Sequence, residues 1–272
     1  MIFLCFFFSG ASSLVSGLVW LRVLALILGD TVSATTAVLA AILTGLALGG
    51  VLVGRIADRR PDPVLLYGAL ASATGVWGAL IPSLLPAFAR VSLGLGVSNY
   101  GFGLIRFGLV LLLLLPATAA TGGMLPLLAR AAGGGGAGVA SRVGRLWAVN
   151  TLGAALGVAA AGYVSLPALG ATATLYVAAA LSVAVGLAAM VVGGRAGGAG
   201  AARFGPGGAS GTREPARTRG PREGEGAPRS PVALALLSAI GLGAAAAMVY
   251  GRAWARVLAL IIGNSTYAFT AM

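Results

Sequence analysis

Long uncharged apolar runs constrain this chain more than any other feature of its sequence. Residues 2–21, 34–54, 107–129 and 171–194 contain no charged side chain. An apolar run of about 18 residues or more indicates a transmembrane helix. Inside a bilayer the backbone must satisfy its own hydrogen bonds, which leaves helices or a closed barrel. Because the runs are continuous and do not alternate, we predict an all-α polytopic membrane protein.

Turn-forming and charged segments set the predicted helix boundaries. The predicted N-terminal helices lie at residues 2–28, 33–54, 64–81, 104–128, 146–166 and 171–192. Pro82 and Pro86 are expected to end the third helix and to leave 83–103 as a loop. Pro116 and Pro126 are expected to kink or break the fourth helix, because proline removes a backbone donor.

The segment 194–231 differs in composition from everything before it. It is rich in Gly, Pro and Arg, so it cannot bury a core, and we predict a disordered cytoplasmic linker. Apolar sequence then resumes and predicts a seventh helix and the beginning of an eighth. The predicted organisation is a six-helix N-terminal half (1–193), the linker, and the start of a second half (232–272). The chain is therefore expected to be truncated within that second half.

Arginine supplies all 18 cationic residues, and most of them lie in alternate connections between the predicted helices. The connections 54–63 and 130–145 and the linker are arginine-rich, so the positive-inside rule places them and the N-terminus in the cytoplasm. The expected location is the bacterial inner membrane. A net charge of +12 would suggest nucleic acid in a soluble chain. Here topology explains the charge, so the expected partner is the lipid bilayer, not nucleic acid.

One phrase occurs twice in the chain. Residues 20–31 read WLRVLALILGDT, and residues 254–265 read WARVLALIIGNS. Trp, Arg, the run Val-Leu-Ala-Leu-Ile and Gly fall in register, which aligns the first helix with the seventh. This is the layout of transporters built from two parallel six-helix halves. Arg22 and Arg256 would then be symmetry mates.

Two features resemble a known family. The segment GRIADRR at residues 54–60 resembles the signature that follows the second helix of the major facilitator superfamily. The wider text, including TGGMLPLLAR and VGRLWAVNTLGAALGVAAAGYVSLPALG, resembles the membrane region of bacterial fused major-facilitator/spermidine-synthase-like proteins. The resemblance covers most of residues 3–193 and about 237–272. It implies a transporter-like membrane region that precedes a soluble aminopropyltransferase-like domain, which this chain does not include.

Asp58, Arg59 and Arg60 carry the charge of the GRIADRR segment. The resemblance implies a gating loop that docks at a helix end and biases inward against outward states. An aspartate is favoured at a helix N-terminus by the helix dipole, which supplies a mechanism. The alternative is a cationic loop that sets topology only.

Further arginines lie within or at the edge of apolar helices: Arg22, Arg106, Arg252 and Arg256. A charge at the centre of a bilayer costs roughly 2.5–3.5 kcal/mol on insertion scales. Arg22 lies about 10 Å from the end of its helix, near enough for its side chain to reach the interface, and Trp20 fits an interfacial aromatic residue. One interpretation is snorkelling with capping of helix carbonyls; the other is a gate or an anion contact.

Small residues recur at helical spacing on two predicted helices: Ala37, Ala41, Gly45 and Gly49 on one, and Gly153 and Gly157 on the other. Such stripes let two helix backbones approach closely in a membrane. Close packing is the first interpretation, and a substrate path along the stripe is the second.

The sequence supports no catalytic, cofactor-binding or metal site. With no His and no Lys, it lacks a Walker lysine, a Schiff-base lysine, a Ser–His pair and an imidazole ligand. The acidic residues lie outside the apolar helix interiors, so paired carboxylates are not supported either. Whether the complete protein is an enzyme depends on the domain that the resemblance implies.

The first functional hypothesis is the transporter-like region of a fused spermidine-synthase-like protein, non-catalytic in itself. The second is an ordinary major facilitator transporter, and the third is a membrane anchor for a soluble enzyme. Expected partners are the remainder of the second half and a synthase-like domain. Because the membrane half offers arginines and almost no acid, the charge favours an anionic or neutral solute over a polyamine.

Overall fold

A computed structural model describes residues 2–29, 32–57, 62–94, 100–131 and 137–202, together with single residues between 242 and 257. The chain divides into two units, Met1–Ala202 and Arg203–Met272. The described residues of the second unit are helical: Leu242, Gly243, Ala246, Tyr250, Gly251, Ala253 and Val257.

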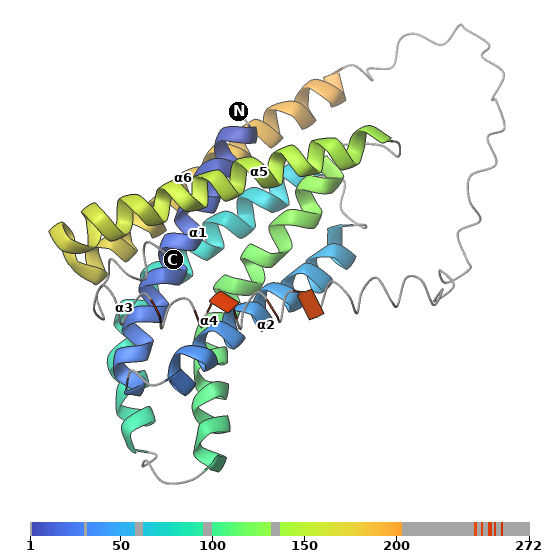
Figure 1. The fold of residues 1–272 in the computed structure, drawn as a ribbon. Helices are drawn as coiled ribbons and strands as arrows, with labels where there is room; N and C mark the ends of the chain where they lie inside the picture. The colour runs from blue at the N-terminus through green and yellow to red at the C-terminus, as the bar shows by residue number, and fades with distance from the viewer. Residues whose placement is uncertain are drawn as a thin grey trace, which may run out of the picture. The chain divides into compact units, whose positions relative to one another are not determined.

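The first unit consists of helices (Figure 1). They are α1 (Ile2–Leu28), α2 (Val32–Ala57), α3 (Pro63–Gly94), α4 (Tyr100–Ala131), α5 (Ala137–Ala160), the short π-helix η1 (Ala161–Ser165) and α6 (Leu166–Ala202). The described residues contain no strand, which confirms the all-α prediction for this part of the chain.

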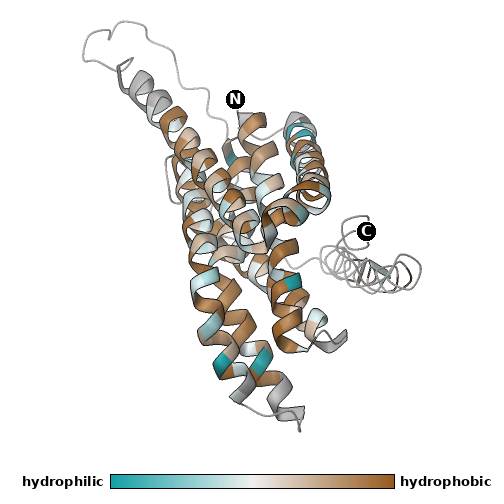
Figure 2. Cartoon of the chain, turned by 90° about the vertical axis from the view of Figure 1, so that its left-hand side faces the viewer, coloured by the Kyte–Doolittle hydropathy of each residue, from teal (hydrophilic) through white to brown (hydrophobic). Residues whose placement is uncertain are grey.

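Five described helical stretches are long and apolar enough to cross a membrane, and Figure 2 shows that few strongly hydrophilic residues interrupt these helices. They are Phe3–Leu28, Ala34–Ile56, Pro63–Ser92, Leu104–Leu128 and Ser141–Gly194. The fifth stretch has 54 residues and covers most of α5, all of η1 and most of α6. Gly170 interrupts it with φ 79° and ψ 174°. Figure 1 shows that the chain reverses direction between α5 and α6.

Local sequence explains where two of the helices begin and end. Asp62 precedes α3 and Pro63 is its first residue, a pairing that suits a helix start because the carboxylate meets the helix dipole and the proline needs no donor there. Gly29 follows α1 with φ 101°, a left-handed conformation that glycine adopts without a Cβ penalty.

The predicted end of the third helix was wrong. Helix α3 runs through Pro82 and Pro86 to Gly94, and α4 already begins at Tyr100, so most of the predicted loop 83–103 is helical. Each proline costs one backbone hydrogen bond. An apolar loop of this length would leave many more backbone groups unpaired in a membrane, so the helix is the better solution.

Other boundaries also lie further out than predicted. Helix α4 continues through Pro116 and Pro126, so neither proline breaks it. Helix α5 begins at Ala137, inside the predicted loop 130–145, and α6 extends to Ala202. The remainder of the predicted linker lies outside the described residues.

Two clusters of buried apolar side chains show that neighbouring helices alternate in direction. The first cluster includes Val19, Trp20, Leu21, Leu24, Val38, Ala41, Ile81, Phe88, Val110, Leu113, Leu114, Ala117, Leu166 and Leu175. The second includes Phe6, Tyr67, Ala71, Met124, Leu127, Leu128, Leu146, Val185 and Ala189. The second cluster therefore gathers the beginnings of α1, α3 and α5 with the ends of α4 and α6. The first gathers the ends of α1 and α3 with the beginnings of α2, α4 and α6.

The most extensive packing joins α2 with α4, α3 with α6 and α1 with α5. Helix α1 crosses α5 in the same way that α4 crosses α2. A Cβ added at Gly10 of α1 would meet the Asn150 carbonyl of α5, and one added at Gly122 of α4 would meet the Leu46 carbonyl of α2. Both crossings therefore bring a helix backbone directly against a glycine.

The next contact along each crossing matches as well. A Cβ at Gly153 would meet the Phe7 carbonyl, and one at Gly49 would meet the Ala119 carbonyl. Phe7 and Ala119 lie three residues before Gly10 and Gly122, on α1 and α4. Gly153 and Gly49 lie three residues after Asn150 and Leu46, on α5 and α2. The two crossings therefore share one register.

The contact between α3 and α6 is symmetric with itself. A Cβ at Gly68 would meet the Gly186 carbonyl, and one at Gly186 would meet the Gly68 carbonyl. Gly68 also approaches the Met190 amide, and Gly186 approaches the Ser72 amide, each four residues further along. Exchanging α1–α3 with α4–α6 thus reproduces these glycine contacts. Because α1 and α4 run in opposite directions, the two three-helix units are inverted repeats.

Candidate functional site

The most distinctive polar feature of the described interior is a row of side chains on α1. Ser9, Ser12, Ser16 and Trp20 follow one another at helical spacing, which places them on one face of the helix. All four are buried, with exposures of 1% to 6%. We call these residues the α1 polar stripe.

The hydroxyl groups of the stripe join α1 to two other helices. Ser12 Oγ donates to the Ala178 carbonyl of α6 at 2.7 Å and also pairs with Ser182 Oγ. Ser9 Oγ donates to Met124 Sδ of α4 at 3.5 Å, a weak sulfur acceptor. In a membrane such interhelical bonds contribute on average about 0.6 kcal/mol each, so they orient the helices more than they hold them.

Trp20 ends the stripe with a donor that has no partner among the residues that the structure describes. Its indole Nε1 is buried without a hydrogen bond, inside the first apolar cluster and beside Gly78 of α3. Trp77 of α3 is a useful contrast, since its Nε1 donates to the Leu113 carbonyl at 2.9 Å. A buried donor without an acceptor costs about 1–3 kcal/mol, so the Trp20 N–H is an energetic cost at the end of the stripe.

The chemistry available to the stripe is neutral. Hydroxyl groups donate and accept, and an indole donates, so every polar group of the row is uncharged. Among the described residues no group of His, Cys, Asp or Glu is placed to hold a metal ion. The only described carboxylate, Asp62, lies at the start of α3 and is exposed. The stripe therefore contains neutral donors and acceptors but no general acid or base.

The described membrane arginines lie at the helix ends. Arg22 is exposed, two residues from the inward-facing Trp20, so the two neighbouring members of the repeated phrase face different surroundings. Trp20 is thus a core residue and not the interfacial aromatic residue that we predicted. Half-buried Arg106 of α4 donates through Nη2 to the Ser92 carbonyl in the last turn of α3, at 3.4 Å. This contact has the form of the predicted capping of helix carbonyls.

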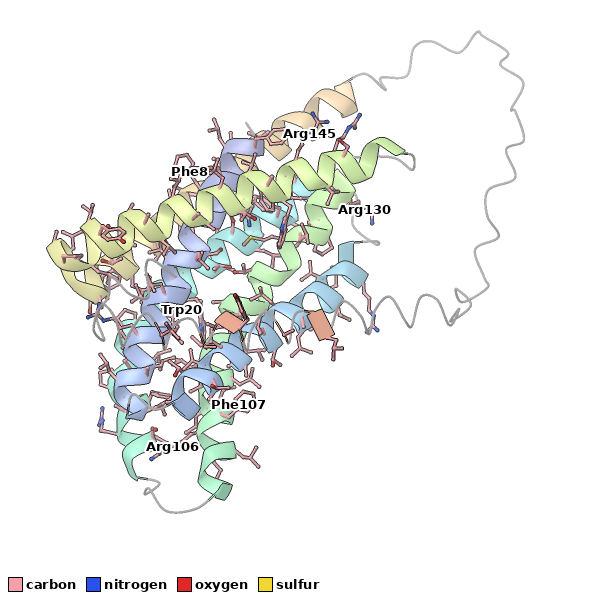
Figure 3. The ribbon with its side chains drawn as sticks, viewed as in Figure 1. Phe8, Trp20, Arg106, Phe107, Arg130 and Arg145 are labelled. Carbon is pink, nitrogen blue, oxygen red and sulfur yellow. The ribbon has the colours of Figure 1, made fainter. Side chains whose placement is uncertain are left out.

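Exposed arginines also gather at the opposite end of the first unit: Arg55, Arg130, Arg142 and Arg145. They belong to the end of α2, the end of α4 and the beginning of α5. Figure 3 shows Arg130 and Arg145 at this same end, and Arg106 at the other. Several predicted residues, namely Asp58, Arg59, Arg60, Arg252 and Arg256, lie outside the described residues.

The predicted small-residue stripes lie at the two matched crossings. Ala41 is fully buried, and a Cβ at Gly45 would meet the side chain of Thr118 on α4. Gly49 lies against α4 as well, while Ala37 is only half-buried. On α5, Gly153 and Gly157 face α1, where a Cβ at Gly157 would meet Ala11. Close backbone contact therefore occupies both stripes, which leaves no space for a solute along them.

Sequence reasoning did not single out the α1 polar stripe. Its signal was present, because Ser9, Ser12 and Ser16 recur at i, i+3 and i+7 within an uncharged apolar run. Serine is common in membrane helices, so spacing alone does not tell an interhelical bond from a solvent-facing hydroxyl. The inverted-repeat register was also missed, since it depends on which helices touch.

Comparison with known proteins gives no match: no protein-family model, no curated protein and no solved structure is significantly similar to the chain.

Proposed function

We propose that the described helices form the first half of a two-half, major-facilitator-like transporter in a bacterial inner membrane. Its α5–α6 segment would cross the membrane twice, which gives six crossings and places the N-terminus and the arginine-rich end in the cytoplasm. The observation that carries this proposal is the shared register of the two glycine crossings, because inverted repeats are typical of secondary transporters.

The solute that fits this proposal is anionic or neutral. The α1 polar stripe consists of neutral donors and acceptors, and the only described carboxylate lies at a helix end. A polyamine path would require carboxylates or aromatic cages, because a cation is bound through negative charge or a ring face. If the complete protein is a fused spermidine-synthase-like protein, its membrane region would then serve a solute other than the polyamine itself.

Alternating access of the stripe tests the proposal. In a Cys5→Ser background, Ser16→Cys places the only thiol on the stripe, where the native side chain is 6% exposed. We expect a small membrane-impermeant thiol reagent to label this cysteine from one side of the membrane. The labelled side should change when a gradient or a solute shifts the protein between its inward-facing and outward-facing states. The control Leu114→Cys, at a fully buried core position, should stay unlabelled. Labelling that never depends on conditions would favour the third hypothesis, a membrane anchor.

The solute class has a separate test. We expect vesicles that contain the complete protein to show no uptake of labelled spermidine that is lost in the Arg22→Ala variant. Such uptake would contradict the anionic or neutral solute and support a polyamine path. The ordinary transporter and the fused protein differ in whether a soluble domain is present. The length of the protein isolated from its natural source distinguishes these two alternatives.

A further inference from the structure

The contact between α1 and α3 brings a buried donor close to a carbonyl group that lacks its usual helical donor. The Trp20 indole Nε1 is buried and makes no hydrogen bond to any residue that the structure describes. A Cβ added at Gly78 of α3 would lie 3.9 Å from Trp20 Cζ2, an atom on the same edge of the indole ring as Nε1. The N–H edge of the ring therefore lies beside the main chain of Gly78.

Proline at position 82 leaves the Gly78 carbonyl able to accept a hydrogen bond from another helix. In a regular helix this carbonyl would accept from the backbone N–H of residue 82. Pro82 lies inside α3 and has no N–H, and in a membrane a carbonyl freed by proline can be satisfied by a neighbouring helix. An indole is a suitable donor, because Trp77 Nε1 already donates to the Leu113 carbonyl of α4 at 2.9 Å.

Helix packing keeps this donor and acceptor apart in the described state. Trp20 belongs to the first apolar cluster, whose side chains confine the ring, so it can reach the carbonyl only if α1 moves relative to α3. Helix α1 packs mainly against α5 and α6, and α3 mainly against α4 and α6, so their direct contact is short. Ser12 of α1 is bonded to Ala178 and Ser182 of α6, and these bonds hold α1 in its present position.

We infer that α1 and α3 form a two-state contact that is governed by competing hydrogen bonds. In the described state Ser12 is bonded to α6 and the Trp20 N–H is unpaired. In a second, less populated state α1 shifts along α3, the Ser12 bonds to α6 break, and Trp20 Nε1 donates to the Gly78 carbonyl. Small sliding movements of packed helices of this kind are a common form of conformational change. The inference concerns the first unit alone and does not depend on transport.

Exchange measurements on the indole N–H groups provide the test. The full chain contains four tryptophans, so isotope labelling of the indole nitrogens in bicelles gives signals that single Trp→Phe variants assign. Relaxation dispersion detects a minor state of about 0.1–10% that exchanges within microseconds to milliseconds. We expect the Trp20 signal to exchange with a hydrogen-bonded minor state. The Trp77 signal should show no such exchange, because its N–H is already bonded.

Two proline variants test the acceptor. Pro82→Ala supplies a backbone N–H to the Gly78 carbonyl, so the population of the paired state should fall about fivefold. This change corresponds to one net hydrogen bond of about 1 kcal/mol. Pro86→Ala is the matched control, since it makes the same change one turn further along α3 and supplies a donor to the Pro82 carbonyl instead. It should leave the exchange of Trp20 unchanged.

Ser12→Ala tests the competition in the opposite direction. It removes the bonds to α6 and should raise the paired population about threefold for each bond lost, because an interhelical hydrogen bond in a membrane contributes about 0.6 kcal/mol on average. Ser9→Ala removes a hydroxyl group that is bonded to Met124 of α4. Its effect should be smaller, because sulfur is a weak acceptor.

Three results would overturn the inference. The first is a Trp20 signal without exchange in the unmodified chain, which decides the question even if a variant does not fold. The second is an equal effect of Pro82→Ala and Pro86→Ala, which would attribute the exchange to a general stiffening of α3. The third is magnetisation transfer from water to the Trp20 N–H in the minor state, which would assign the acceptor to an internal water.

Discussion

At the scale of single residues, the identity of one small side chain decides whether two helices can meet. Gly10 and Gly17 both lie on α1, but only Gly10 faces a neighbouring backbone, where an added Cβ would meet the Asn150 carbonyl. Gly17 has no atom within reach of an added Cβ.

We predict that Gly10→Ala lowers the free energy of unfolding by about 1–3 kcal/mol through overpacking. Gly17→Ala should be neutral or stabilising by up to about 1 kcal/mol, because alanine favours the helix. Denaturant titration of both variants in bicelles measures the difference, and equal effects would contradict the close crossing.

Two inward-facing tryptophans, Trp20 and Trp77, allow a second prediction at this scale. Trp77→Phe removes the hydrogen bond to the Leu113 carbonyl and should cost about 0.5–1.5 kcal/mol beyond any change in packing. Trp20→Phe removes a donor that has no partner, so its cost should be smaller. The same titration compares them. A larger cost for Trp20→Phe would show that its N–H has an acceptor, such as an internal water.

At the scale of elements, the α5–α6 segment is the clearest case of a backbone requirement. Gly170 has φ 79° and ψ 174°, a region that is essentially restricted to glycine. We predict that Gly170→Ala destabilises the protein by about 1–3 kcal/mol, because the reversal between α5 and α6 would be strained. Gly194→Ala in the same helix, where an added Cβ meets nothing, serves as the control and should be tolerated. If the two variants melt at the same temperature, the segment does not turn at Gly170.

At the scale of the whole first unit, the inverted repeats require an even number of crossings. Gly94, Gly144 and Gly194 are exposed helical residues where an added side chain meets no neighbour. In a Cys5→Ser background we predict that Gly144→Cys and Gly194→Cys are labelled by an impermeant maleimide from one side of the membrane. Gly94→Cys should be labelled from the other side, because α3 ends there. Labelling of Gly144→Cys and Gly194→Cys from opposite sides would mean that α5 and α6 together cross only once.

The sequence by itself determined the class of the fold and indicated helices long and apolar enough to cross a membrane. Inside a bilayer the backbone can form only helices or a closed barrel, and the continuous uncharged runs favour helices, so long apolar helices followed directly. The absence of His and Lys excluded whole classes of chemistry in the same direct way. The spacing of Gly45 with Gly49, and of Gly153 with Gly157, marked faces suited to close packing without showing which helices they meet.

Only the tertiary structure decided the partners and the boundaries. The predicted end of α3 was wrong because each proline removes only one backbone hydrogen bond. Keeping the rest of the segment helical satisfies the backbone hydrogen bonds of many residues, so the helix continues through both prolines. The orientation of Trp20 toward the core and of Arg22 toward the surface depends on the rotation of α1 against its neighbours. The register that relates Gly10 to Gly122 arises from contacts between residues far apart in the chain. No periodicity within a single helix encodes such contacts, because they are fixed by helix-to-helix packing.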